Sequence, residues 1–170
     1  LAEKIDVEAI WQVVENEKRS FVLNEITNIY FSTPENSKYN TAMAIVLNKD
    51  KYYFKFSNYK YLPNKPLQVE TLKDFHQKTI ETEKAIISLL SAMLKNILPE
   101  KLDASQQAFL HHLKQYAIYG EDYKNKHIIK PFFSMLKPHK TIQQTIFNML
   151  VSTNIFNINE PIELYKNLNC

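Results

Sequence analysis

Lysine and tyrosine side chains interleave through residues 49–65, and this stretch carries the most distinctive chemistry of the sequence. Ammonium groups bind phosphates and exposed rings stack on unpaired bases, so the mixture is typical of surfaces that hold single-stranded nucleic acid. Strand alternation turns every second side chain inward, so about half of the rings are expected in a core. We expect contacts mainly from the lysines, with Tyr59 as the candidate ring. The lysines concerned are Lys51, Lys55, Lys60 and Lys65.

A second basic cluster occupies residues 124–140, which contain lysines and histidines but no acid. We take Lys126 and Lys130 as further candidates for contact with nucleic acid. A solvated helix face is the simpler explanation of such a run, and it stays open here. The other members are Lys124, Lys137 and Lys140 with His127 and His139.

The basic residues favour contact with a nucleic-acid backbone over reading of bases. Arg19 is the only arginine, and the formal net charge is +3. Lysine offers a point charge to phosphate but lacks the bidentate fork with which arginine reads guanine. We therefore do not expect sequence-specific binding of DNA.

Catalytic or metal chemistry has little support in this chain. His111 and His112 are adjacent, so on a helix they point about 100° apart and cannot share a metal. There is no H-E-x-x-H motif, and Cys170 is the only cysteine. The aspartates are scattered, with no cluster to hold a divalent ion. We expect no catalytic residue, no metal ligand and no cofactor here.

Glycine occurs once, at Gly120. Phosphate-binding loops and dinucleotide fingerprints need several glycines for close backbone approach, so both are excluded. Hairpin-rich folds need them for turns. The chain should therefore be mainly helical.

Hydrophobic spacing places three helices before the lysine-rich stretch. They are expected over residues 5–15, 22–31 and 37–48, with a break at Pro34. The period then changes, and the aromatic-rich segments 51–56 and 59–62 read as two strands around a turn at Ser57 and Asn58. Three helices followed by a β-hairpin wing is the order of a winged helix-turn-helix.

Helical periodicity returns after the wing. One long helix is expected over 67–98, with a buried stripe that includes Leu72, Phe75 and Leu94. Capping boxes at Asp103 and Thr141 open two more helices, to Tyr119 and about Ser152. A helix from His127 to Lys137 would tolerate Pro131 only near its first turn. A last short helix would start at Pro161.

These elements predict a mainly α fold with two domains: a winged helix-turn-helix over 1–66 and a helical bundle with one long helix over 67–170. No apolar run reaches the roughly 20 residues that span a bilayer, so no membrane partner is expected. The single cysteine favours a reducing compartment such as the cytoplasm.

Several short segments, taken in order, resemble the N-terminal region of the ribonuclease II/R (RNB) family. They are residues 5–11, 25–31, 50–55, 61–63, 68–72 and 119–122. The resemblance implies a hydrolytic, processive 3′→5′ exoribonuclease. Its aspartate-rich catalytic domain would hold a divalent metal, taken as Mg²⁺, and would follow Cys170. This chain, which starts at Leu1 without a methionine, would be a fragment.

On that resemblance, the chain guides single-stranded RNA toward its own catalytic domain and is inactive alone. Relatives often carry a Gly- and Arg-rich turn in the wing, where this sequence has Phe56, Ser57, Asn58 and Tyr59. Two other classes stay open. One is a DNA-binding winged-helix regulator. The other is a protein-docking module, which predicts an exposed apolar patch on the long helix.

Overall fold

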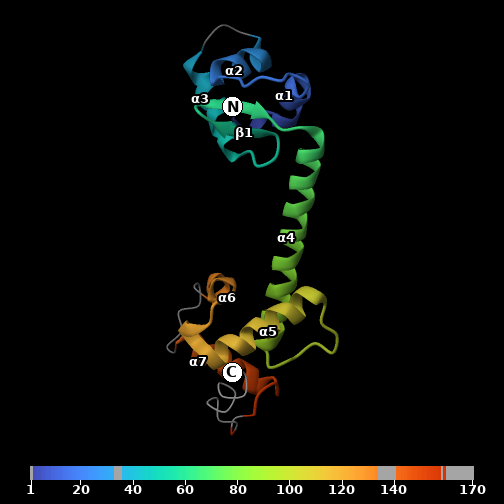
Figure 1. Cartoon of the computed structure of the whole chain (residues 1–170), viewed down its shortest axis with the longest axis vertical. Coiled ribbons are helices and arrows are strands. Elements are labelled where there is room, and N and C mark those ends of the chain that lie inside the picture. Colours follow the sequence, from blue (N-terminus) through green and yellow to red (C-terminus); the bar gives the residue numbers. More distant parts are fainter. Residues whose placement is uncertain (1, 33–35, 134–140, 158, 160–170) are drawn as a thin grey trace. The chain divides into compact units, whose positions relative to one another are not determined.

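The computed structural model describes residues 2–32, 36–133, 141–157 and 159 (Figure 1). It is mainly helical, with one two-stranded antiparallel sheet. The chain divides into two compact units, Leu1–Lys78 and Thr79–Cys170. This division falls inside helix α4 (Pro66–Met93), whereas the sequence placed the boundary after residue 66. Among the described helices, none has the length and apolar character that a bilayer crossing needs.

Unit 1 begins with a short 3-10 helix, η1 (Ala2–Lys4), and three α-helices that lie close to the expected ranges: α1 (Val7–Val14), α2 (Leu23–Phe31) and α3 (Ser37–Lys49). Polar caps fix their starts. The Asp6 carboxylate accepts a hydrogen bond from the Ala9 N–H, and the Asn36 side chain accepts one from the Lys38 N–H. Ser32 has a left-handed backbone that ends α2.

The sheet is a hairpin of β1 (Phe54–Ser57) and β2 (Lys60–Pro63). A single bridge adds Phe21, from the segment between α1 and α2, to the free side of β2. Phe21 and Tyr61 exchange both backbone hydrogen bonds, each 2.8 Å long. The segment that precedes α2 is therefore attached to the hairpin.

The first strand is shorter than expected because of one carboxylate. Asp50 ends α3, and its side chain accepts hydrogen bonds from the N–H groups of Tyr52, Tyr53 and Phe54, the last at 2.7 Å. These bonds hold residues 51–53 in a bend, so β1 starts at Phe54 and not at Lys51. The turn likewise lies at Asn58 and Tyr59, one residue later than predicted.

The core of unit 1 joins the helices to the inner face of the hairpin. Trp11 donates from its indole nitrogen to the Asn64 carbonyl at 2.7 Å, and its ring lies 5.5 Å from that of Tyr53. Burial of these apolar groups supplies most of the stability of such a unit. The core residues include Ile10, Val14, Phe21, Ile26, Met43, Leu47, Phe54, Tyr61 and Val69.

Helix α4 starts with Pro66 at its first position, where a missing N–H costs nothing. It ends at Met93 because Asn96 takes a left-handed backbone with φ of 60°, and the Ile97 N–H returns to the Ala92 carbonyl. The predicted end at Leu98 is therefore wrong by one turn.

The predicted continuous stripe on α4 is also wrong. Val69 is buried in the core of unit 1 and Met93 in the core of unit 2, but the residues between 70 and 85 are exposed or half-buried. Helical spacing records which side chains share a face, and it does not record whether anything covers that face. The predicted stripe members Leu72, Phe75 and Leu94 are exposed.

Unit 2 continues with α5 (Ala104–Tyr119), the 3-10 turn η2 (Gly120–Asp122), α6 (Lys126–Phe133) and α7 (Ile142–Ser152). The expected capping box is present at Asp103, which accepts from the Gln106 N–H. Thr141 accepts from the Gln144 N–H, but the Gln144 side chain donates to Asn148, so the second capping box is only half formed. Pro131 lies in the second half of α6, later than the first turn that we expected. The predicted continuation to Lys137 and the helix at Pro161 lie outside the described residues.

One glycine allows α5 and α7 to pack closely. Gly120 has φ of 57° and ψ of −127°, a conformation open to glycine alone. A Cβ there would lie 2.5 Å from Oε1 of Gln143, whose amide donates to the Ala117 carbonyl at 3.0 Å. The core of the unit includes Leu89, Met93, Phe109, Leu113, Tyr116, Ile129, Phe133, Ile146 and Leu150.

Candidate nucleic-acid interface

The register of the hairpin sorts its side chains onto two faces. Lys55 pairs with Leu62 and Ser57 with Lys60, while Phe54 pairs with Pro63 and Phe56 with Tyr61. Cross-strand partners share a face, and successive residues alternate. The inner face carries the aromatic rings, and the outer face carries the two lysines.

The outer face borders a hollow of about 570 Å³. Ser20 lines the hollow because the neighbouring residue, Phe21, forms a bridge to β2. The hollow therefore combines two ammonium groups with hydroxyl and amide groups, all of which can donate to phosphate oxygens. The lining residues are Ser20, Lys55, Ser57, Asn58, Lys60 and Leu62.

Lys55 and Lys60, here called the hairpin lysines, are exposed and form no ion pair within the part of the chain that is described. The charge of Lys60 is the last of the causes that lower the pKa of Glu25, after the Val22 N–H bond and Arg19. Lys51 lies in the bend that Asp50 holds, and Lys65 precedes α4. Neither lines the hollow, so the structure joins two of the four predicted lysines.

The tyrosines of this stretch divide as strand alternation required. Tyr53 and Tyr61 are buried, and burial raises the pKa of both phenols. Tyr52 is half-buried, with its ring 5.8 Å from that of His76. Tyr59 is 89% exposed at the tip of the hairpin. It is therefore the one tyrosine of the four whose ring is open to a ligand.

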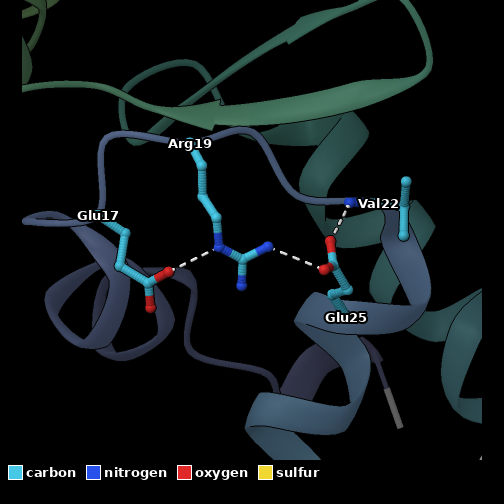
Figure 2. A network of polar contacts seen from close by, with 4 residues as sticks. All are labelled: Glu17, Arg19, Val22 and Glu25. Carbon is cyan, nitrogen blue, oxygen red and sulfur yellow. Dashed lines mark hydrogen bonds and ion pairs between the residues drawn. The ribbon is translucent and has the colours of Figure 1, made fainter.

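The single arginine is held by two carboxylates (Figure 2). Arg19 donates to Glu17 and to Glu25 at 2.8 Å each, and its guanidinium lies 4.0 Å over the ring of Phe21. The second oxygen of Glu25 accepts the Val22 N–H at 2.8 Å. That backbone bond, and then Arg19, lower the pKa of Glu25. The network fixes residues 17–22, the segment that brings Ser20 to the hollow.

Lys126 and Lys130, here called the α6 lysines, belong to unit 2 and have a different environment. Nζ of Lys130 lies 2.8 Å from Oε2 of Glu121, and Nζ of Lys126 lies 3.5 Å from the same oxygen and donates to the Glu121 carbonyl at 2.6 Å. The Tyr116 hydroxyl donates to Oε1 at 2.8 Å. Led by the Lys130 contact, these groups lower the pKa of Glu121 to about 2.

Helix α3 presents little that reads bases. Lys38, Thr41 and Ile45 are exposed along one side of it, and Asn40 is half-buried. A hollow of about 440 Å³ lies there, lined in part by Ala2, Ala42 and Ile45. The apolar side chain of Ile45 is exposed on this side of α3, where the recognition helix of a sequence-specific DNA-binding protein would present arginine, asparagine or glutamine.

The histidines of unit 2 take part in a structural contact. Nδ1 of His112 lies 2.6 Å from the Tyr123 hydroxyl. The centres of the His111 and His112 rings are 6.0 Å apart. Burial, and then His111 and His127, lower the pKa of His112. Across the described residues, no three His, Cys, Asp or Glu side chains gather in a way that could hold a metal ion.

Sequence reasoning missed Ser20 and Glu121. Ser20 enters the hollow through a single bridge, for which the sequence gives no periodic signal. Glu121 stands just before the acid-free run 124–140, and only the turn at η2 brings its carboxylate back to α6. Comparison of the chain with protein-family models, curated proteins and solved structures gave no match.

Proposed function

We propose that this chain is the non-catalytic, RNA-positioning N-terminal region of a hydrolytic 3′→5′ exoribonuclease of the ribonuclease II/R type. The observation that carries the proposal is the outer face of the hairpin, where Lys55 and Lys60 border one hollow and, among the described residues, no acid is in ion-pair contact with them. Unpaired ammonium groups keep their charge available to phosphates, whose binding releases counterions. The hollow also offers hydroxyl and amide donors.

The proposal assigns unit 1 a winged helix-turn-helix arrangement. Three helices precede a hairpin, and Phe21, between α1 and α2, forms a single bridge to β2 on the side where a third strand would pair. This order and pairing support the assignment. The catalytic domain, with its Mg²⁺, would lie beyond this chain, and the cytoplasmic location remains a prediction from the single cysteine.

Binding of single-stranded RNA tests the role of the hairpin. Replacing both hairpin lysines by glutamine should weaken binding and lower the log–log salt slope by about 0.7 for each lost phosphate contact. A matched control, Lys78→Gln with Lys101→Gln, removes the same charge from exposed positions elsewhere. Equal losses in the two double variants, measured by fluorescence anisotropy over a salt series, would mean that the hairpin has no specific role.

A second candidate function, docking of a protein partner, is favoured by exposed apolar side chains of α4 and of the turn that follows it. Within unit 2, Ile87 and Leu94 are exposed and border a hollow of about 170 Å³ together with Phe132 and Met149. The segment 84–95 and α6 carry lysines, and neither they nor α7 contains an acid. An acidic partner segment that inserts an apolar side chain fits this surface.

A synthetic helical peptide with leucines flanked by glutamates tests docking. It should bind the chain more tightly than the same peptide with lysines in place of the glutamates, and Leu94→Asp should abolish the difference. Indifference to peptide charge would remove this candidate. The remaining alternative, a DNA-binding regulator, has weaker support because α3 exposes Ile45 and Arg19 is held by Glu17 and Glu25.

A further inference from the structure

The turn between β1 and β2 holds two residues in the left-handed region. Asn58 has φ of 50° and Tyr59 has φ of 59°. Positive φ at both central positions is the pattern of a type I′ turn, in which asparagine followed by glycine is preferred. Asn58 agrees with this preference, but Tyr59 stands where glycine is favoured. Its Cβ crowds the following carbonyl oxygen, so the side chain opposes the turn that it occupies.

Nothing in the described chain compensates for this conformation. The Tyr59 ring is 89% exposed, and the side chain has no ring contact, hydrogen bond or ion pair among the described residues. Tyr53 and Tyr61, by contrast, are buried in the core. Strained backbone that persists at an exposed residue without structural benefit is a feature of binding sites.

The neighbours of Tyr59 complete a binding arrangement. Asn58 and Lys60, on either side of it in sequence, both line the outer hollow, and Lys55 lies on the same face. An exposed aromatic ring therefore stands beside a basic hollow. A nucleotide presents the same pair of features, a flat base next to a phosphate, and base–aromatic stacking tolerates any base.

We infer that Tyr59 is a base-stacking tip, which takes an unpaired base of the strand whose phosphates lie against the hairpin lysines. The inference rests on the proposed RNA-binding role of the hairpin and adds a preference for single strands over duplexes. The bases of a duplex are already stacked on one another, so a duplex does not engage the Tyr59 ring. It also means that removal of the Tyr59 ring weakens RNA binding, whereas replacement of Tyr59 by a residue that suits the left-handed turn stabilises the chain.

The test uses the full chain with two labelled probes, a short oligoadenylate and an abasic ribose-phosphate oligomer of the same length. Tyr59→Gly and Tyr59→Asn both accept the left-handed backbone without a ring, and Tyr59→Phe keeps the ring. The ring-free variants should bind oligoadenylate roughly tenfold more weakly, whereas Tyr59→Phe should bind it like the parent. All three should bind the abasic oligomer like the parent.

Thermal unfolding of the same variants supplies the second readout. Tyr59→Gly and Tyr59→Asn should raise the midpoint by a few degrees, because glycine has no Cβ to crowd the backbone and asparagine adopts the left-handed region at less cost than tyrosine. Unchanged affinity for oligoadenylate, an equal loss with the abasic oligomer, or a lower midpoint would each overturn the inference. The Lys55→Gln, Lys60→Gln variant separates this failure from that of the proposed function, since it must weaken binding of both probes whatever Tyr59 does.

Discussion

The hairpin lysines and the α6 lysines look alike in sequence, since both lie in lysine-rich stretches that contain aromatic or histidine side chains. Their environments differ in the folded chain. Lys55 and Lys60 border a hollow and have no carboxylate within ion-pair distance among the described residues, whereas Lys126 and Lys130 both contact Glu121. A count of charges in a window therefore overestimates the positive potential of the second cluster.

The acids near the two groups explain the difference. Asp50, the acid of the first stretch, is occupied by three backbone N–H groups of residues 52–54. Glu121 instead turns its carboxylate toward α6 and is further held by Tyr116. An acid that satisfies backbone donors leaves neighbouring lysines available, and an acid that faces lysines reduces what they offer to a ligand.

The largest effect is expected at the acid of the hairpin. Asp50→Ala leaves the N–H groups of Tyr52, Tyr53 and Phe54 without their charged acceptor, which should destabilise unit 1 by about 3 kcal/mol. Urea unfolding followed by the fluorescence of Trp11 measures this change. Asp74→Ala, at an exposed position of α4, is the control and should unfold like the parent. A loss below about 1 kcal/mol would show that the bend does not depend on the carboxylate.

The next effect concerns the turn that positions Glu121. Gly120→Ala forces a side chain into a backbone conformation with φ of 57° and against Gln143, and should cost about 2 kcal/mol. Gln143→Ala removes the side chain that the new Cβ would contact. The double variant therefore separates the steric contact with Gln143 from the backbone strain at residue 120. If the strain dominates, the double variant stays as unstable as Gly120→Ala in thermal unfolding.

The comparison of the two lysine pairs is tested directly by RNA affinity. Replacement of Lys126 and Lys130 by glutamine should weaken binding of single-stranded RNA less than replacement of the hairpin lysines, because Glu121 already compensates their charge. Glu121→Gln should raise the affinity for single-stranded RNA by roughly twofold to fivefold. The substitution frees the ammonium groups of Lys126 and Lys130 from their ion pairs with Glu121, and exposed ion pairs of this kind are weak. Anisotropy titrations at fixed salt measure both. A larger loss at α6 than at the hairpin would reverse our ranking.

The smallest effect is a pH dependence within the Glu121 group. Burial, and then the bond to Glu121, raise the pKa of Tyr116 from 10 to about 12. Its contribution to stability is therefore complete below pH 10 and is lost as the pH rises through 12. Glu121, with a pKa lowered from 4.5 to about 2, contributes above pH 4.5 and loses this contribution toward pH 2. Ultraviolet titration of tyrosinate should show a phenol that titrates near pH 12 and that Tyr116→Phe removes.

The sequence predicted most of the elements because each has a local cause. Capping side chains at Asp103 and Thr141 marked the starts of α5 and α7, and the change from helical to alternating spacing marked the hairpin. Errors arose where a distant or specific contact decided the outcome. The Asp50 carboxylate delayed β1, and Asn96 ended α4 before Leu98.

The sequence by itself determined a mainly helical chain with a lysine-rich hairpin, since periodicity, caps and glycine scarcity are properties of neighbouring residues. Only the tertiary structure decided which charges are available. The bridge at Phe21 brought Ser20 to the hairpin lysines, and the turn at Gly120 brought Glu121 to the α6 lysines. It also showed Tyr59 in a left-handed turn with its ring exposed. Such pairings depend on how the backbone folds back on itself, which local spacing does not record.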